Sequence, residues 1–91
     1  MTNGGYQLVV AATAERSLAR LPEAVAAAIV EFMVGPLAEA PRRVGHPLRR
    51  ELAGLWSARR GSYRVVNEID DDAAEVRVLR IDHPSDVYRS R

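Results

Sequence analysis

The arginines of this chain gather in one stretch, residues 42–64. The stretch holds seven arginines against one acid, Glu51, so its local net charge is seven minus one, +6, whereas the whole chain has a formal net charge of +1. The seven are Arg42, Arg43, Arg49, Arg50, Arg59, Arg60 and Arg64. Guanidinium groups offer a planar fork of N–H donors that suits phosphate oxygens. The concentration of positive charge therefore predicts a surface that binds phosphate.

Two of these arginines are placed to act together. Arg59 and Arg64 lie five residues apart on predicted strands joined by Gly61-Ser62, so a tight hairpin brings them close on neighbouring strands, where both can reach one phosphate. Because arginine keeps its proton up to a pH of about 12, the expected role is electrostatic. Arg60 alternates to the other side of a regular strand and is expected to contact a different binding partner, RNA or protein.

The remaining members of the stretch are expected in a loop region. There they can bind an RNA backbone in a sequence-independent way, or they can be solvated charges. These residues are Arg42, Arg43, Arg49 and Arg50.

Three further candidate site residues lie near the C-terminus, namely His83, Tyr88 and Arg89. Period-2 alternation puts His83 on the face of Leu79 and Ile81, where its imidazole can exchange a proton near neutral pH or simply pack at the strand end. The Tyr88 phenol can stack on a nucleotide or anchor the tail by packing. Arg89 can touch phosphate or remain solvated.

Length and composition restrict the class of protein. Ninety-one residues suffice for one domain, residues 1–91, with one core. The absence of cysteine excludes disulfides and thiolate sites, and two histidines far apart in sequence argue against a metal site. The N-terminus does not look like a signal peptide, and no apolar run approaches the roughly 18 residues of a membrane span. A soluble cytoplasmic protein without a membrane partner is expected.

The first forty residues predict a strand followed by two helices. The strand is Tyr6–Ala11, and Thr13 is the expected N-cap of a helix that ends at Arg20. Pro22 suits the start of the second helix, and Gly35-Pro36 is expected to stop or kink it. Pro41 is expected to close a short turn.

The second half of the chain predicts three strands linked by short turns, an arrangement typical of antiparallel neighbours. The strands are Leu55–Arg60, Tyr63–Ile69 and Glu75–Asp82. The expected fold class is α+β, an antiparallel β-sheet with an N-terminal helical hairpin packed on one face and the other face open.

Short motifs in a fixed order run through nearly the whole chain, from about Tyr6 to Arg89. They are LARLP (18–22), PL (47–48), LAGLWS (52–57), Arg59 with Gly61, YRVV (63–66), IDD (69–71), and His83 with DVYR (86–89). In these the chain resembles the RelE branch of the RelE/ParE superfamily of type II toxins. The resemblance implies a RelE-like fold and a toxin that enters the ribosomal A site, cleaves mRNA without metal or cofactor, and is silenced in a hetero-oligomer with its antitoxin.

The resemblance also implies roles. Arg59 and Arg64 would stabilise charge, His83 would move a proton and Tyr88 would orient the substrate. The sequence departs from the family at Asn67, where relatives usually have an aromatic residue, and at Pro84, where many have arginine. It also has no lysine at all.

Two other activities are compatible with the same fold. One is a ParE-like inhibitor of DNA gyrase that performs no chemistry of its own. The other is a degenerate toxin that retains only antitoxin binding. In each case an acidic, largely helical antitoxin segment that folds on binding is the expected partner.

Overall fold

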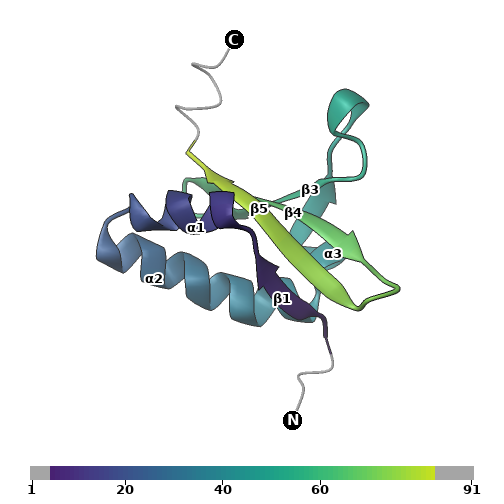
Figure 1. Ribbon diagram of the computed structural model, residues 1–91, viewed down its shortest axis with the longest axis horizontal. Helices are drawn as coiled ribbons and strands as arrows, with labels where there is room; N and C mark the ends of the chain where they lie inside the picture. The colour runs from purple at the N-terminus through teal and green to yellow at the C-terminus, as the bar shows by residue number, and fades with distance from the viewer. Residues whose placement is uncertain (1–4, 84–91) are drawn as a thin grey trace.

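The structure is a computed structural model, and it describes residues 5–83. Five strands form one sheet in the order β1-β5-β4-β3-β2 (Figure 1). The strands are β1 (Gln7–Val10), β2 (Gly45–Pro47), β3 (Trp56–Arg60), β4 (Tyr63–Asp70) and β5 (Glu75–Asp82). The predicted α+β fold is confirmed, and the three C-terminal strands begin and end within one residue of their predicted bounds.

Strand direction differs from the prediction at one edge of the sheet. The pairings of β2 with β3, β3 with β4 and β4 with β5 are antiparallel, as expected from short connections. The pairing of β1 with β5 is parallel, so the sheet is mixed. No short connection links these two strands, and the turn pattern that predicted the other pairings therefore does not apply to them.

The helices α1 (Ala12–Ala19) and α2 (Glu23–Phe32) follow β1 and form the predicted hairpin (Figure 1). The prediction for Thr13 was wrong, because the N-cap is Ala11 and Thr13 lies inside the first turn. Its hydroxyl instead donates a hydrogen bond to the carbonyl of Leu79 on β5. Thr13 thus fastens α1 to the sheet, a long-range contact that a local capping pattern does not reveal.

The helix does not stop at Gly35-Pro36. It continues from α2 into a π-helical turn, η1 (Met33–Leu37), which contains Pro36. The wider turn accommodates a residue that has no N–H to donate. Pro41 likewise does not close a turn, because it is the first residue of the short helix α3 (Pro41–Val44), a position that proline favours.

The arginine-rich connection expected as a loop therefore contains α3, β2 and a 3-10 turn, η2 (Arg50–Leu52). The segment around η2 stands away from the sheet (Figure 1).

The core lies between the helical hairpin and one face of the sheet. Ala14, Ile29 and Met33 supply its helical side. On the sheet side, one row of residues that pair directly across β3, β4 and β5 contributes Ala58, Val65 and Ile81. Directly paired residues share a face, and successive residues in a strand alternate between faces. The residues on either side of this row therefore point to the face away from α1 and α2.

A bulge interrupts this alternation. The register between β4 and β5 shifts between Val66 and Asn67, so that Asn67 faces Val78 and Leu79 is the extra residue. Asn67 is fully buried, and its Nδ2 donates to the carbonyl of Val65 at 3.0 Å. Its Oδ1 has no hydrogen-bond partner among residues 5–83. The polar residue at this family departure is therefore buried with one unsatisfied acceptor.

Candidate functional site

Arg59 and Arg64 face each other directly across β3 and β4. Arg64 is also directly opposite Asp82 on β5. These three residues alternate with the core row of Ala58, Val65 and Ile81, so they lie on the face of the sheet away from α1 and α2. The placement predicted for the two arginines, side by side on neighbouring strands, is confirmed.

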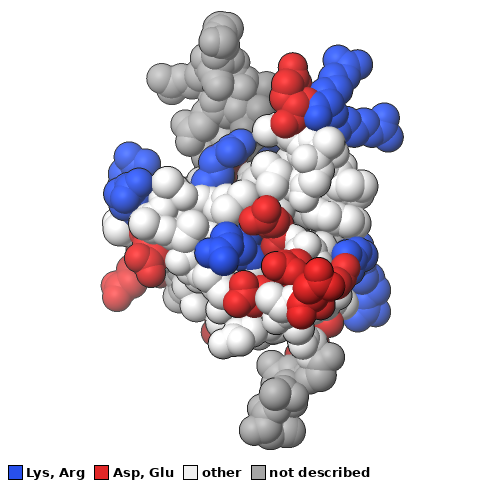
Figure 2. All heavy atoms as spheres, turned by 45° about the vertical axis from the view of Figure 1, so that its right-hand side comes forward, with Lys and Arg blue, Asp and Glu red and all other residues white. Residues whose placement is uncertain are grey.

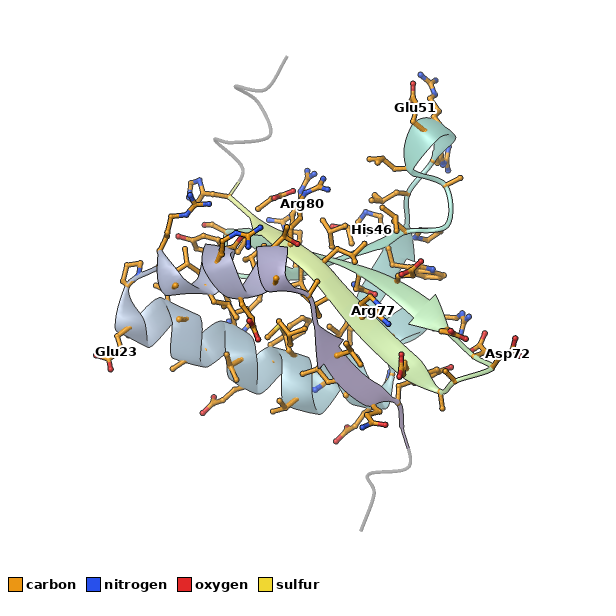
Figure 3. All side chains as sticks on the ribbon, viewed as in Figure 1. Glu23, His46, Glu51, Asp72, Arg77 and Arg80 are labelled. Carbon is orange, nitrogen blue, oxygen red and sulfur yellow. The ribbon has the colours of Figure 1, made fainter. Side chains whose placement is uncertain are left out.

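The next row on the same face runs His46, Ser57, Val66 and Arg80 from β2 to β5. Figure 3 shows His46 and Arg80 on the side of the sheet away from α2. We call the set His46, Arg59, Arg64, Arg80 and Asp82 the arginine face. It joins three guanidinium groups, one imidazole and one carboxylate.

Sequence reasoning missed three members of the arginine face, His46, Arg80 and Asp82. Arg80 and Asp82 could have been found, because both alternate with Ile81 on the predicted strand Glu75–Asp82. His46 could not, because its place depends on β2, a three-residue strand without a sequence signal.

The one acid of the arginine face has a defined partner. Arg80 Nε donates to Asp82 Oδ2 at 2.9 Å, and the Asp82 side chain is 19 % exposed. Asp82 therefore holds Arg80 along β5 while it lies beside Arg64 in the sheet register. Further along the same face, Arg77 lies opposite Glu68, and the acids of the β4–β5 turn follow. Arg77 is thus surrounded by acids, and the net positive charge of this face lies at the end of the sheet near Arg59 and Arg64.

Arg42 is already engaged in a different role. Its Nη2 lies 2.7 Å from Asp71 Oδ2 and its Nη1 donates to Asp71 Oδ1 at 3.2 Å, while the Tyr6 hydroxyl donates to the same Oδ1 at 2.7 Å. Its guanidinium carbon also lies 5.7 Å from the centre of the Trp56 ring. The Arg42 hydrogen bond, and then that of Tyr6, lowers the pKa of Asp71, and the bond to Asp71 raises the pKa of Arg42.

Arg42 therefore ties α3 to the β4–β5 turn. Asp71, expected to be part of a solvated hairpin tip, is the acceptor of this connection. Arg43, Arg49 and Arg50 are exposed, and no ion pair of theirs occurs within residues 5–83. The segment that carries η2 ends in side chains of both signs at the tip of the molecule (Figure 2).

Arg60 points away from Arg59, as alternation predicted. It lines a hollow of about 330 Å³ with Gly61, Ser62, Tyr63 and residues of α2, on the helix side of the sheet. The α2 residues are Ala24, Val25, Ala28 and Ile29. The side chains of the neighbouring residues Arg59 and Arg60 thus lie on opposite faces of the sheet.

His83 lies on the helix side as well. It lines a hollow of about 480 Å³ with Ile81 and the end of α1, including Ser17 and Arg20. Its ring packs edge-on against Tyr63, with 5.0 Å between ring centres. The predicted shared face with Ile81 is confirmed, but Leu79, the bulge residue, breaks the pattern. The structure therefore does not bring His83 onto the arginine face.

The predicted roles of Tyr88 and Arg89 concern residues outside the described part of the chain. Within residues 5–83, no group of three or more histidine, cysteine, aspartate or glutamate side chains could hold a metal ion. No helix in that range is long and apolar enough to cross a membrane.

The chain matches the family described as ParE toxin of type II toxin-antitoxin system, parDE, over residues 8–88. It is 52 % identical over 84 residues to Toxin RelG of Mycobacterium tuberculosis, covering 92 % of this chain and 97 % of the relative. It is 54 % identical over 84 residues to Toxin RelE of the same organism, covering 92 % and 87 %.

Solved structures agree. The toxin-antitoxin complex RelBE2 from Mycobacterium tuberculosis contains a chain with a TM-score of 0.85 and 52 % identity, covering 87 % of this chain and 98 % of that one. The Escherichia coli RelBE complex matches in fold, with a TM-score of 0.70 at 21 % identity, covering 86 % and 95 %. The chain therefore belongs to the RelE/ParE superfamily and is a toxin of a type II toxin-antitoxin system.

Proposed function

We propose that this toxin is an endoribonuclease that cleaves mRNA in the ribosomal A site without metal, and so inhibits translation. The observation that carries the proposal is the direct pairing of Arg59 with Arg64 on the face of the sheet away from α1 and α2. The similarity to toxins named RelE and RelG supports the same class of activity.

The arginine pair fits the charge that develops during RNA cleavage. When a 2′-hydroxyl attacks the adjacent phosphate, negative charge grows on the phosphate oxygens and must be stabilised. Directly opposed residues in a sheet have Cβ atoms about 4.5–5.5 Å apart, so both guanidinium groups can reach one phosphate. A preorganised donor of this kind typically contributes about 3 to 4 kcal/mol to the transition state.

The surrounding charges fit a large RNA partner. Arg49 and Arg50 are exposed at the projecting η2 segment, and Arg43 is exposed on α3. Contacts of these arginines to ribosomal RNA backbone would add sequence-independent affinity. From the family resemblance, Tyr88 orients the substrate. Arg89, next to it in the sequence, is a further candidate contact to phosphate. The same resemblance assigns proton transfer to His83, whose side chain lies on the helix side.

An antitoxin is the second proposed partner, and the complex would form in the cytoplasm. Val30 and Val34 are exposed on the outer surface of the α2–η1 helix, and the hollow beside Arg60 is lined largely by apolar residues of α2. An acidic amphipathic segment could cover this apolar surface and neutralise arginines at the same time. The solved complexes of related toxins with RelB antitoxins support this partner.

The decisive experiment adds purified toxin to a cell-free translation extract and maps cleavage by primer extension on a defined mRNA. The toxin should arrest translation and produce mRNA ends at the A-site codon, and the Arg59→Ala,Arg64→Ala double variant should not. Arg60→Ala is the matched control, because it removes an arginine from the same strand on the other side of the sheet.

A second candidate is inhibition of DNA gyrase, favoured by the description of the matching family as a ParE toxin. In that case the extract would show no mRNA cleavage, and purified gyrase would accumulate double-strand breaks when the toxin is added. A chain that does neither, yet binds its antitoxin, would be the degenerate toxin.

A further inference from the structure

The arginine face contains a titratable base that neither the sequence motifs nor the comparisons assign. We propose that His46 is the general base that removes the proton from the attacking 2′-hydroxyl. The assignment rests on the proposed endoribonuclease function. It names the residue that performs a step for which the arginines are unsuited, since a guanidinium group does not give up its proton at neutral pH.

His46 lies in a suitable position for this step. His46 pairs with Ser57 on β3, and Arg59 is the next residue of β3 on the same face. Diagonal neighbours of this kind lie about 7–8 Å apart, and Arg64 lies one strand further. A phosphate held between the two guanidinium groups is therefore flanked by the imidazole. His46 is also exposed, so a nucleotide can reach it.

The hydroxyl group of Ser57, which lies directly opposite His46 in the sheet, also supports the assignment. Ser57 is 2 % exposed, and its Oγ has no hydrogen-bond partner within residues 5–83. A buried hydroxyl without a partner is costly, by about 1–3 kcal/mol, and therefore requires an explanation. Because Ser57 is directly opposite His46, its hydroxyl is placed to orient the imidazole when substrate is bound.

The two histidines of the chain lie on different faces of the sheet. His83 lies on the helix side, where its ring contacts Tyr63. Of these two imidazoles, His46 alone shares a face with Arg59 and Arg64. Histidine imidazoles exchange protons near neutral pH, which suits a base for a hydroxyl.

The step balances as follows. The neutral imidazole of His46 takes the 2′-hydroxyl proton while the O2′–phosphorus bond forms and the phosphorus–O5′ bond breaks. The upstream fragment then ends in a 2′,3′-cyclic phosphate, and the O5′ oxygen takes a proton from water to become a 5′-hydroxyl. The imidazolium returns its proton to water, so no metal, oxidant or other reactant is consumed.

The test is single-turnover cleavage of a defined mRNA on ribosomes with an empty A site, with toxin in excess. His46→Gln should slow cleavage by roughly 10² to 10⁴, the usual contribution of general acid–base catalysis, while ribosome affinity stays within a few-fold of wild type. The matched control, Glu68→Gln, changes a titratable group on the same face of the sheet but farther from Arg59 and Arg64, and it should cleave within a few-fold of wild type. His83→Gln is measured in parallel, because the family resemblance assigns proton transfer to His83. In His46→Ala, added imidazole should restore part of the lost rate, and thermal melting should confirm that each variant is folded.

Each outcome decides the matter. Equal cleavage rates for wild type and His46→Gln would overturn the assignment. If His83→Gln cleaves slowly while His46→Gln cleaves at the wild-type rate, His83 and not His46 transfers the proton. Loss of ribosome binding in the His46 variants, or a slow His46→Ala that imidazole does not rescue, would show that His46 binds or shapes the site without moving the proton. If wild-type toxin does not cleave mRNA on ribosomes, the proposed function itself fails and this assignment fails with it.

Discussion

The role of Arg64 can be tested by its removal. Arg64 is half-buried on the arginine face, directly between Arg59 and Asp82, whereas the next residue, Val65, fills the core. Arg64→Ala therefore removes a charge from the open face without opening a cavity, and the free energy of unfolding should change by no more than about 0.5 kcal/mol. The loss in the transition state should be about 3 to 4 kcal/mol, since one preorganised donor is missing.

At about 1.36 kcal/mol for each factor of ten, this loss corresponds to a single-turnover rate lower by roughly 10² to 10³. The assay is mRNA cleavage on programmed ribosomes, with urea unfolding as the check on stability. Arg64→Lys keeps the charge without the planar fork and should fall between Ala and wild type. Arg60→Ala should cleave at the wild-type rate. A folded Arg64→Ala toxin that cleaves as fast as wild type would refute the electrostatic role.

Three further predictions concern stability and binding. Asn67→Val removes an unsatisfied buried carbonyl together with the hydrogen bond from the Asn67 amide to Val65, and it should raise the free energy of unfolding in urea by about 1 kcal/mol at unchanged m-value. A comparable fall would show that the hydrogen bond to Val65 outweighs the cost of the unsatisfied carbonyl. The pKa of Asp71 lies below its unfolded value of 3.8, so the bond between Asp71 and Arg42 stabilises the fold above that pH. The stability advantage of wild type over Asp71→Asn should therefore be present at pH 7 and disappear as the pH falls below about 4. A difference in stability that does not depend on pH would contradict the ion pair. Ribosome binding should weaken steeply with salt, and Arg49→Gln,Arg50→Gln should flatten that dependence; an unchanged slope would mean that this segment faces solvent.

The sequence alone determined the parts of the structure that depend on local pattern. The strands β3, β4 and β5 are joined by short turns, and their period-2 alternation is a property of neighbouring residues. The same alternation placed Arg59 with Arg64 and sent Arg60 to the other side, as the structure confirms. The superfamily was also identified from the sequence, because its motifs run through nearly the whole chain.

Contacts between distant segments decided the rest. Pairing of β1 with β5 joins residues far apart in sequence, and Thr13 bonds a carbonyl 66 positions away instead of capping its own helix. The pairing that brings His46 to the arginine face depends on β2, which is too short to have a periodic pattern. Arg42 looked like a free phosphate ligand until the fold brought Asp71 to it.

The two histidines show the difference most clearly. In sequence, His83 sits in a family motif and His46 in an unremarked loop, so only His83 attracted a role. In the structure the alternation of strands puts His83 beside Tyr63 on the helix side, while the short β2 strand carries His46 to the face of Arg59 and Arg64. Residue type and motif are properties of the chain, but the face on which a side chain lies is set by strand pairing, which depends on the whole fold.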